Sequence, residues 1–73
     1  MDEFNEWLEQ QSRRGDRVGD LSRDMRIDRT WPTAKVSRRR LHAYLESQGA
    51  IEGVFDALDE AWDEWDALRK AQR

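Results

Sequence analysis

The chain has 73 residues, of which 37% are hydrophobic and 40% are charged, with a formal net charge of -3. This length allows one domain, which we expect to span residues 1–73, and excludes a deep cavity that encloses a cofactor. There is no cysteine and the only histidine is His42, which excludes disulfides, thiolate metal sites and two-histidine metal motifs.

The first predicted helix covers residues 2–12. Its buried face is indicated by the i, i+3, i+4, i+7 spacing of Phe4, Trp7, Leu8 and Gln11. Acidic residues occupy the other side, which suits the positive end of the helix dipole. Gly15 is expected to stop this helix.

A second helix is predicted over residues 17–29, with Asp16 as its N-cap. Its buried stripe consists of Val18, Leu21 and Met25. The pair Trp31-Pro32 closes this segment, because a residue before proline is pushed out of the helical region.

The third helix is predicted over residues 38–48, with Ser37 as its N-cap and with Leu41, Tyr44 and Leu45 facing inward. Gly49 stands where a left-handed residue ends a helix, and Ala50 or Ile51 could contact Leu45 there.

The fourth helix, over residues 52–71, is the longest. Its apolar stripe steps by threes and fours through Ile51, Val54, Phe55, Leu58, Trp62, Trp65 and Leu68. No segment alternates with period two, so strands are not expected. The sequence therefore predicts an all-α bundle.

Charge is segregated along the chain. Residues 12–42 carry a net charge of +6, whereas residues 43–66 carry eight acids and no bases. The candidate acidic surface consists of Glu52, Asp56, Asp59, Glu60, Asp63 and Glu64. The candidate basic surface consists of Arg13, Arg14, Arg17, Arg38, Arg39 and Arg40.

Two interpretations of this segregation stay open. In the first, the acids and arginines pair within the chain as an ordinary solvated face, with further i,i+4 pairs such as Asp66–Lys70. In the second, the acids of the fourth helix form a surface for a basic partner. This interpretation is favoured by the like-charge i,i+4 pairs Asp56–Glu60 and Asp59–Asp63, which cost stability in the absence of a nearby cation. Arg38 to Arg40 also open a helix, where cations are unfavourable unless an acid of the fourth helix or a phosphate compensates them.

Nucleic-acid binding is the main alternative to a protein partner. Arginine binds phosphate well through its planar fork. The sequence pI of about 5.1 and the absence of aromatic residues among the arginines weigh against this reading.

Catalysis is not expected. Ser37 and His42 lie five residues apart on one helix, without the glycine-flanked turn that exposes a nucleophile. The pair Trp62 and Trp65 is typical of core at this spacing, with an exposed docking patch as the alternative.

Several segments together resemble a known family. They are, in order, Phe4-x-x-Trp7-Leu8, Val18-Gly19-Asp20-Leu21 leading through Asp24 and Asp28 to Trp31-Pro32, Leu41-x-x-Tyr44-Leu45, and Phe55-x-x-Leu58-x-x-Ala61-Trp62-x-x-Trp65. Over residues 4–66 this set is similar to the YozE-like family of small bacterial proteins, which have a SAM-like (sterile alpha motif-like) helical fold. The resemblance implies a compact bundle of four or five short helices, with Trp31 as a plug below the last helix and Trp62 at the centre.

The resemblance brings no catalytic residues, and SAM-like folds generally serve as protein-interaction modules. No apolar run reaches the ~18 residues of a membrane span, and the charged start does not resemble a signal peptide, so we expect a cytoplasmic protein with no membrane partner. The predicted function is a non-enzymatic module, of bacterial or phage origin, for an unknown protein or for head-to-tail self-association. It takes no cofactor, metal or small-molecule substrate. A nucleic-acid-binding protein is the first alternative, and an acidic decoy of a basic host protein is the second.

Overall fold

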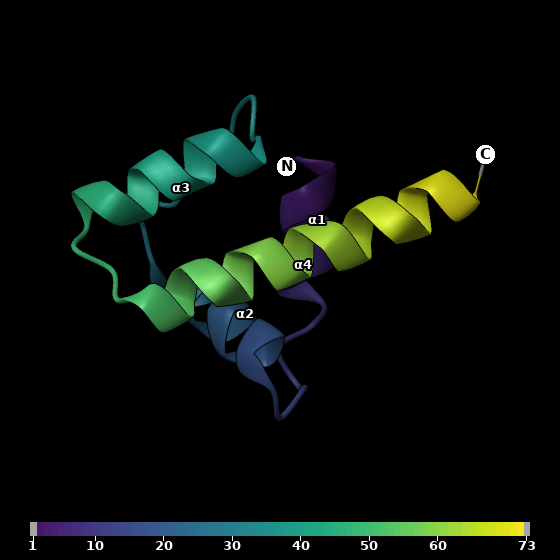
Figure 1. The fold of residues 1–73 in the computed structure, drawn as a ribbon, viewed down its shortest axis with the longest axis horizontal. Coiled ribbons are helices and arrows are strands. Elements are labelled where there is room, and N and C mark those ends of the chain that lie inside the picture. The colour runs from purple at the N-terminus through teal and green to yellow at the C-terminus, as the bar shows by residue number, and fades with distance from the viewer. Residues whose placement is uncertain (1, 73) are drawn as a thin grey trace.

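The computed structural model describes residues 2–72, so that Met1 and Arg73 lie outside the described residues. Within this range the chain forms four helices and no strand (Figure 1): α1 (Glu3–Glu9), α2 (Arg17–Ile27), α3 (Arg38–Ser47) and α4 (Glu52–Ala71). The predicted all-α bundle is confirmed. None of these helices has the length and apolar character needed to cross a membrane.

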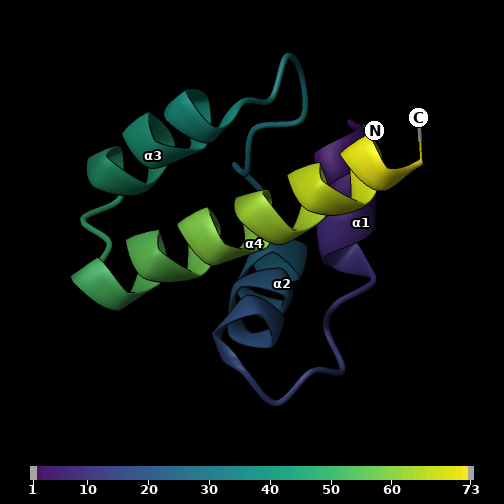
Figure 2. The same ribbon diagram turned by 45° about the vertical axis from the view of Figure 1, so that its right-hand side comes forward.

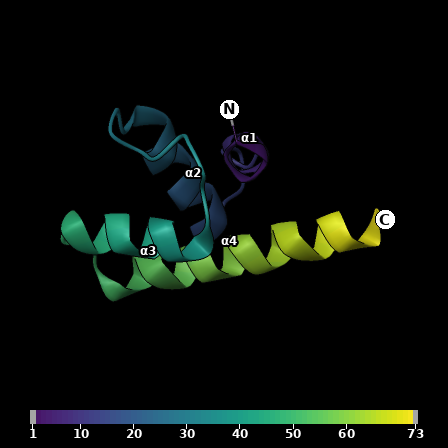
Figure 3. The same ribbon diagram turned by 90° about the horizontal axis from the view of Figure 1, so that it is seen from above.

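Helix α4 is the element on which the other three pack. Helix α3 runs antiparallel beside it, while α1 and α2 cross it on another face (Figures 1 and 3). The view turned by 45° shows the α2–α3 loop rising beyond the start of α3 (Figure 2). Within residues 2–72, α3 packs against α4 but not against α1 or α2.

The helix ends follow local side-chain chemistry. The Asp16 carboxylate accepts a hydrogen bond from the Gly19 N–H at 3.0 Å, and the Ser37 hydroxyl accepts one from the Arg40 N–H at 3.1 Å, as predicted for N-caps. At the end of α3, Gly49 has φ 71°, and the Ala50 N–H donates to the Leu45 carbonyl at 3.1 Å. The predicted contact after Gly49 is therefore made by Ala50 and not by the exposed Ile51.

The first two helices are shorter than predicted. After Glu9 the chain tightens into i,i+3 turns, with hydrogen bonds from the Gln11 N–H to the Leu8 carbonyl and from the Arg14 N–H to the Gln11 carbonyl, so Gly15 does not stop α1. This turn returns close to α2. A Cβ placed on Gly19 would lie 2.0 Å from the Arg14 carbonyl oxygen, which explains glycine at that position.

The core lies where α4 crosses its neighbours. Phe4, Leu8, Val18, Leu41, Leu58 and Ala61 are fully buried. The predicted stripe of α4 was wrong at its two ends, since Ile51 is 75% and Leu68 46% exposed. Leu68 lies on the C-terminal end of α4, which extends past the neighbouring helices (Figures 1 and 3), whereas the small buried residues Ala57 and Ala61 let those helices approach the middle of α4 closely.

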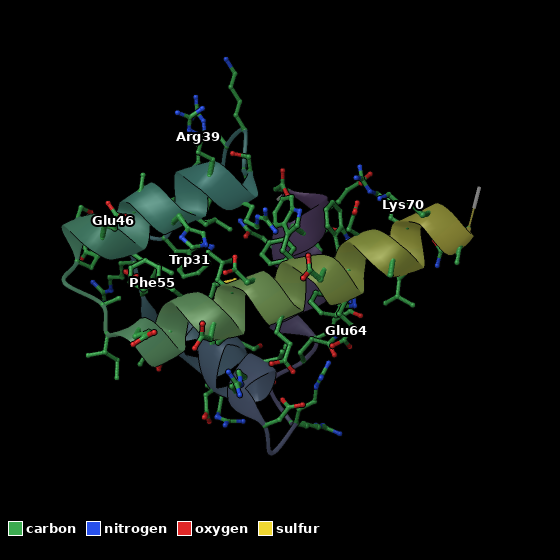
Figure 4. The ribbon with its side chains drawn as sticks, viewed as in Figure 1. Trp31, Arg39, Glu46, Phe55, Glu64 and Lys70 are labelled. Carbon is green, nitrogen blue, oxygen red and sulfur yellow. The ribbon has the colours of Figure 1, made fainter. Side chains whose placement is uncertain are left out.

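Of the two tryptophans that the family resemblance placed, Trp31 agrees with the expectation and Trp62 does not. Trp31 is buried in the core and its ring packs edge-on against that of Tyr44 in α3, at 5.8 Å between centroids, which agrees with the role of a plug; Figure 4 shows it in the gap between α3 and α4 as seen from that side. Trp62 is only partly buried, and its ring centroid lies 4.6 Å from that of Phe4, which takes the central position instead.

Candidate interaction surfaces

Arg14 joins the α1–α2 turn to α4. Its guanidinium donates to both carboxylate oxygens of Glu64, at 2.6 and 3.1 Å, and also to Asp16 at 2.8 Å. These hydrogen bonds, from Glu64 first, raise the pKa of Arg14 above its ordinary value. The same arginine and the Gly19 N–H lower the pKa of the Asp16 carboxyl. Figure 4 shows Glu64 on the side of α4 that faces this turn.

Arg17, the first residue of α2, lies between two acids of α4. Its guanidinium is 3.2 Å from Glu60 and 3.9 Å from Asp56. Asp56 and Glu60 are one of the repelling i,i+4 pairs, and a single arginine bridges them. Because all three side chains are about half exposed, we attribute little net stability to each contact.

Arg38, the first residue of α3, does the same for the other repelling pair. It lies 3.9 Å from Asp59 and 3.6 Å from Asp63. Asp59 also contacts the His42 ring nitrogen at 2.8 Å, and that ring stacks on Phe55 at 5.3 Å between centroids. The unfavourable cation at the start of α3 is therefore compensated by acids of α4, which was one of the two options left open by the sequence.

Most of the predicted acidic surface therefore faces one half of the predicted basic surface. Every residue of the predicted acidic surface except Glu52 has a cationic partner within the chain. In the predicted basic surface, Arg14, Arg17 and Arg38 are used in this way. Among residues 2–72, Arg13, Arg39 and Arg40 form no ion pair.

Some of the cations that form no ion pair lie where the α2–α3 loop enters α3. Arg39, Arg40 and the loop residue Lys35 are exposed, and no ion pair within the described chain includes them. Figure 4 shows Arg39 pointing away from α4, on the far side of α3. Lys35 has φ 53°, a left-handed conformation that is uncommon outside glycine. We call Lys35, Arg39 and Arg40 the basic cluster.

The loop that carries Lys35 and leads into α3 is anchored at two points. At the first, the Tyr44 hydroxyl donates to Asp28, which also accepts from the Thr30 N–H at 3.0 Å and the Thr30 hydroxyl at 2.9 Å. The hydrogen bond from Tyr44 is the main reason that the pKa of Asp28 is lowered. Burial, followed by the same hydrogen bond, raises the pKa of Tyr44.

The second anchor is Asn5, which the sequence analysis missed. Its amide donates to the Pro32 carbonyl at 2.9 Å and accepts from the Trp31 indole N–H at 3.0 Å, while its exposed fraction is only 1%. The one available signal was its position three residues before Leu8, which places a polar side chain on the buried face of α1. Its partners could not be read from the sequence.

The residues considered for a catalytic triad have other partners. The Ser37 hydroxyl caps α3, and the His42 ring contacts Asp59, so the two do not contact each other. Nowhere between residues 2 and 72 do three His, Cys, Asp or Glu side chains gather in a way that could hold a metal ion.

Comparison with known proteins identifies the family. A family model described as the YozE SAM-like fold matches residues 3–67, which is most of the chain, so the chain belongs to this family. The match agrees with the resemblance found over residues 4–66. No curated protein and no solved structure was found to match the chain.

Proposed function

We propose that this member of the YozE SAM-like family is a non-enzymatic interaction module that binds an acidic segment of a partner protein through its basic cluster. The observation that carries the proposal is the contrast between neighbours at the start of α3. Arg38 faces two acids of α4, whereas Arg39 points away from α4 (Figure 4), and neither Arg39 nor Arg40 forms an ion pair within the described residues. Their charge is available to an external anion.

The anchoring of the loop supports this proposal. Asn5 and Asp28 fix the α2–α3 loop to α1 and α3, so the cluster is held in place before a partner arrives. A surface ordered in advance loses less conformational entropy on binding. Arginine also matches the planar carboxylate with two parallel hydrogen bonds.

An acidic protein segment fits this cluster better than nucleic acid does. The chain carries a net charge of -3, which at long range repels a nucleic acid, with a charge on every phosphate, more strongly than a short acidic segment. The nearest tryptophan, Trp31, is buried and its indole N–H is bound to Asn5, so it offers no face for base stacking. The acids of α4 are matched by the chain's own cations, which argues against that helix as the docking surface or as a decoy.

The test is a binding titration with a short labelled Asp/Glu-rich peptide, and with single- and double-stranded oligonucleotides, followed by fluorescence anisotropy at about 50 and 200 mM salt. We expect the peptide to bind at the lower salt. The double variant Arg39→Glu with Arg40→Glu should weaken peptide binding at least about tenfold.

The matched control is the double variant Arg13→Glu with Arg26→Glu. Both residues are exposed and lack ion pairs within the described chain, and the change in net charge is the same. The turn that holds Arg13 lies on the opposite side of α4 from the start of α3 (Figures 1 and 2). An equal loss of binding in the control, or tighter binding of an oligonucleotide than of the peptide, would overturn the proposal.

A further inference from the structure

The end of α4 projects past the body of the molecule, which leaves one side of it without a partner in the described chain. Every residue from 67 to 72 is exposed, and the last turns extend beyond α1 (Figures 1 and 3). Between this projection and α1 lies a cleft, which is lined by Glu3, Trp7, Trp65, Leu68, Arg69 and Gln72.

The aromatic wall of the cleft is continuous with the core. The Trp65 ring packs edge-on against Phe4 at 5.6 Å and against Trp62 at 5.0 Å between centroids. On the other side, Trp7 lies 6.1 Å from Phe4. The Arg69 guanidinium lies 4.7 Å from the centre of the Trp65 ring. These contacts hold two partly buried tryptophans in fixed positions beside the exposed Leu68, and rigid aromatic anchors of this kind commonly dominate protein interfaces.

The two walls of the cleft carry opposite charges. Residues 2–9, which form α1 and its cap, contain acids and no base. The wall formed by α4 presents Arg69, with Lys70 beside it; both contact Asp66, which leaves one positive charge in excess. Figure 4 shows Lys70 on this projecting end. A patch with an apolar centre, an acidic side and a basic side is complementary to a copy of itself.

We propose that this cleft is the contact of a two-fold symmetric dimer, in which the α1 acids of one copy meet the α4 cations of the other. In a two-fold contact both copies use the same patch, so each contact occurs twice. Glu3 of the first copy faces Arg69 of the second, and Glu3 of the second copy faces Arg69 of the first. Leu68 of each copy covers the tryptophans of the other. The patch is small compared with the ~800 Å² per partner of a standard interface, so the dimer is weak and depends on concentration. This surface shares no residue with the basic cluster, and its failure or success is independent of the proposed function.

The decisive experiment mixes two charge-reversed variants. Glu3→Arg places a base on both walls at the proposed contact, and Arg69→Glu places an acid on both walls there, so each variant alone repels its own copy at that contact. An equimolar mixture places opposite charges at both contacts of a mixed dimer. We expect sedimentation velocity to show a dimer for the unchanged chain at up to about 1 mM, little dimer for either variant alone, and recovery in the mixture. Recovery on mixing reports a contact between molecules, which a defect in folding cannot produce.

Leu68→Asp provides a second test, with Ile27→Asp as its control. Leu68 lies at the proposed contact, whereas Ile27 is 83% exposed on α2, away from the cleft. Neither change touches the buried core. Leu68→Asp should abolish the dimer and Ile27→Asp should leave it unchanged. A monomer at every concentration, an equal effect of both aspartates, or no recovery in the mixture would overturn the proposal.

Discussion

Replacing the buried Asn5 by leucine should remove two hydrogen bonds that join α1 to the α2–α3 loop. Leucine has a similar volume, so the change leaves the Trp31 indole N–H and the Pro32 carbonyl without partners in place of the bonds of 3.0 and 2.9 Å. Each buried polar group left unsatisfied costs about 1–3 kcal/mol. Part of this cost is offset by the apolar surface that leucine buries, so we expect a net loss of about 2–4 kcal/mol.

This loss is large for a chain of this size. At about 0.05–0.15 kcal/mol per residue, 73 residues have a free energy of unfolding of about 4–11 kcal/mol. The melting temperature should fall by about 10–25 °C, since small domains lose about 4–8 °C for each kcal/mol. Urea unfolding followed by far-UV circular dichroism gives the free energy directly, and thermal unfolding gives the shift.

Two comparisons separate the hydrogen bonds from other effects of the substitution. Ser22→Ala also removes a buried polar group, but its hydroxyl makes only one bond of 3.3 Å, to the Glu9 carbonyl, so we expect a loss of about 1 kcal/mol. Trp31→Phe removes the indole N–H, so Asn5→Leu should cost about 1–2 kcal/mol less in that background. A loss below about 0.5 kcal/mol for Asn5→Leu would refute the reasoning.

Three further predictions concern stability. Gly19→Ala should destabilise the fold by about 1–3 kcal/mol, because its Cβ meets a backbone carbonyl at 2.0 Å. Gly53→Ala, in the first turn of α4, should stabilise the fold by about 0.5–1 kcal/mol, because its Cβ meets nothing within 4 Å. Thermal unfolding of both variants checks the contrast. Ile51→Asp should stabilise the fold by about 0.5–1 kcal/mol in urea unfolding, because α4 lacks a side-chain N-cap. Ile51 is 75% exposed, and its extended backbone, with φ -80° and ψ 163°, suits a capping residue. A loss of stability would show that Ile51 makes apolar contacts that matter. The lowered pKa of Asp28 means that its hydrogen bonds stabilise the fold fully above the ordinary carboxyl pKa, and that this contribution is lost as the pH falls through the folded-state pKa. Tyr44→Phe should therefore flatten the dependence of stability on pH below the ordinary carboxyl pKa, as measured by urea unfolding at a series of acidic pH values. Equal slopes for both proteins would contradict it.

The helices could be predicted because their signals are local. The caps at Asp16 and Ser37 and the left-handed Gly49 are set by residues within one or two turns. The exposure of Ile51 and Leu68 could not be predicted in this way. An apolar stripe shows which face of α4 can be buried, but how far the burial extends depends on where the neighbouring helices cross it.

The charged surfaces were predicted only in part. The like-charge pairs on α4 indicated that cations must approach, and the sequence supplied enough arginines. Which arginines approach depends on the arrangement of α2 and α3 around α4. Arg17 and Arg38 reach α4 because each begins a helix beside it, whereas Arg39 extends the other way from the same turn as Arg38. Neighbours in sequence thus have opposite roles, a difference that spacing alone does not reveal.

Helix α4 follows the other three helices along the chain, and this order has a consequence for protein synthesis. Because α3 packs on α4 and, in the described part of the chain, on neither α1 nor α2, the first three helices have no common core until α4 is complete. Phe4, Leu8 and Leu41, which are buried in the fold, stay exposed to solvent while the nascent chain emerges. The arginines that pair with α4 lack these acidic partners until α4 is made. We therefore expect the complete fold to form only after α4 has left the ribosome.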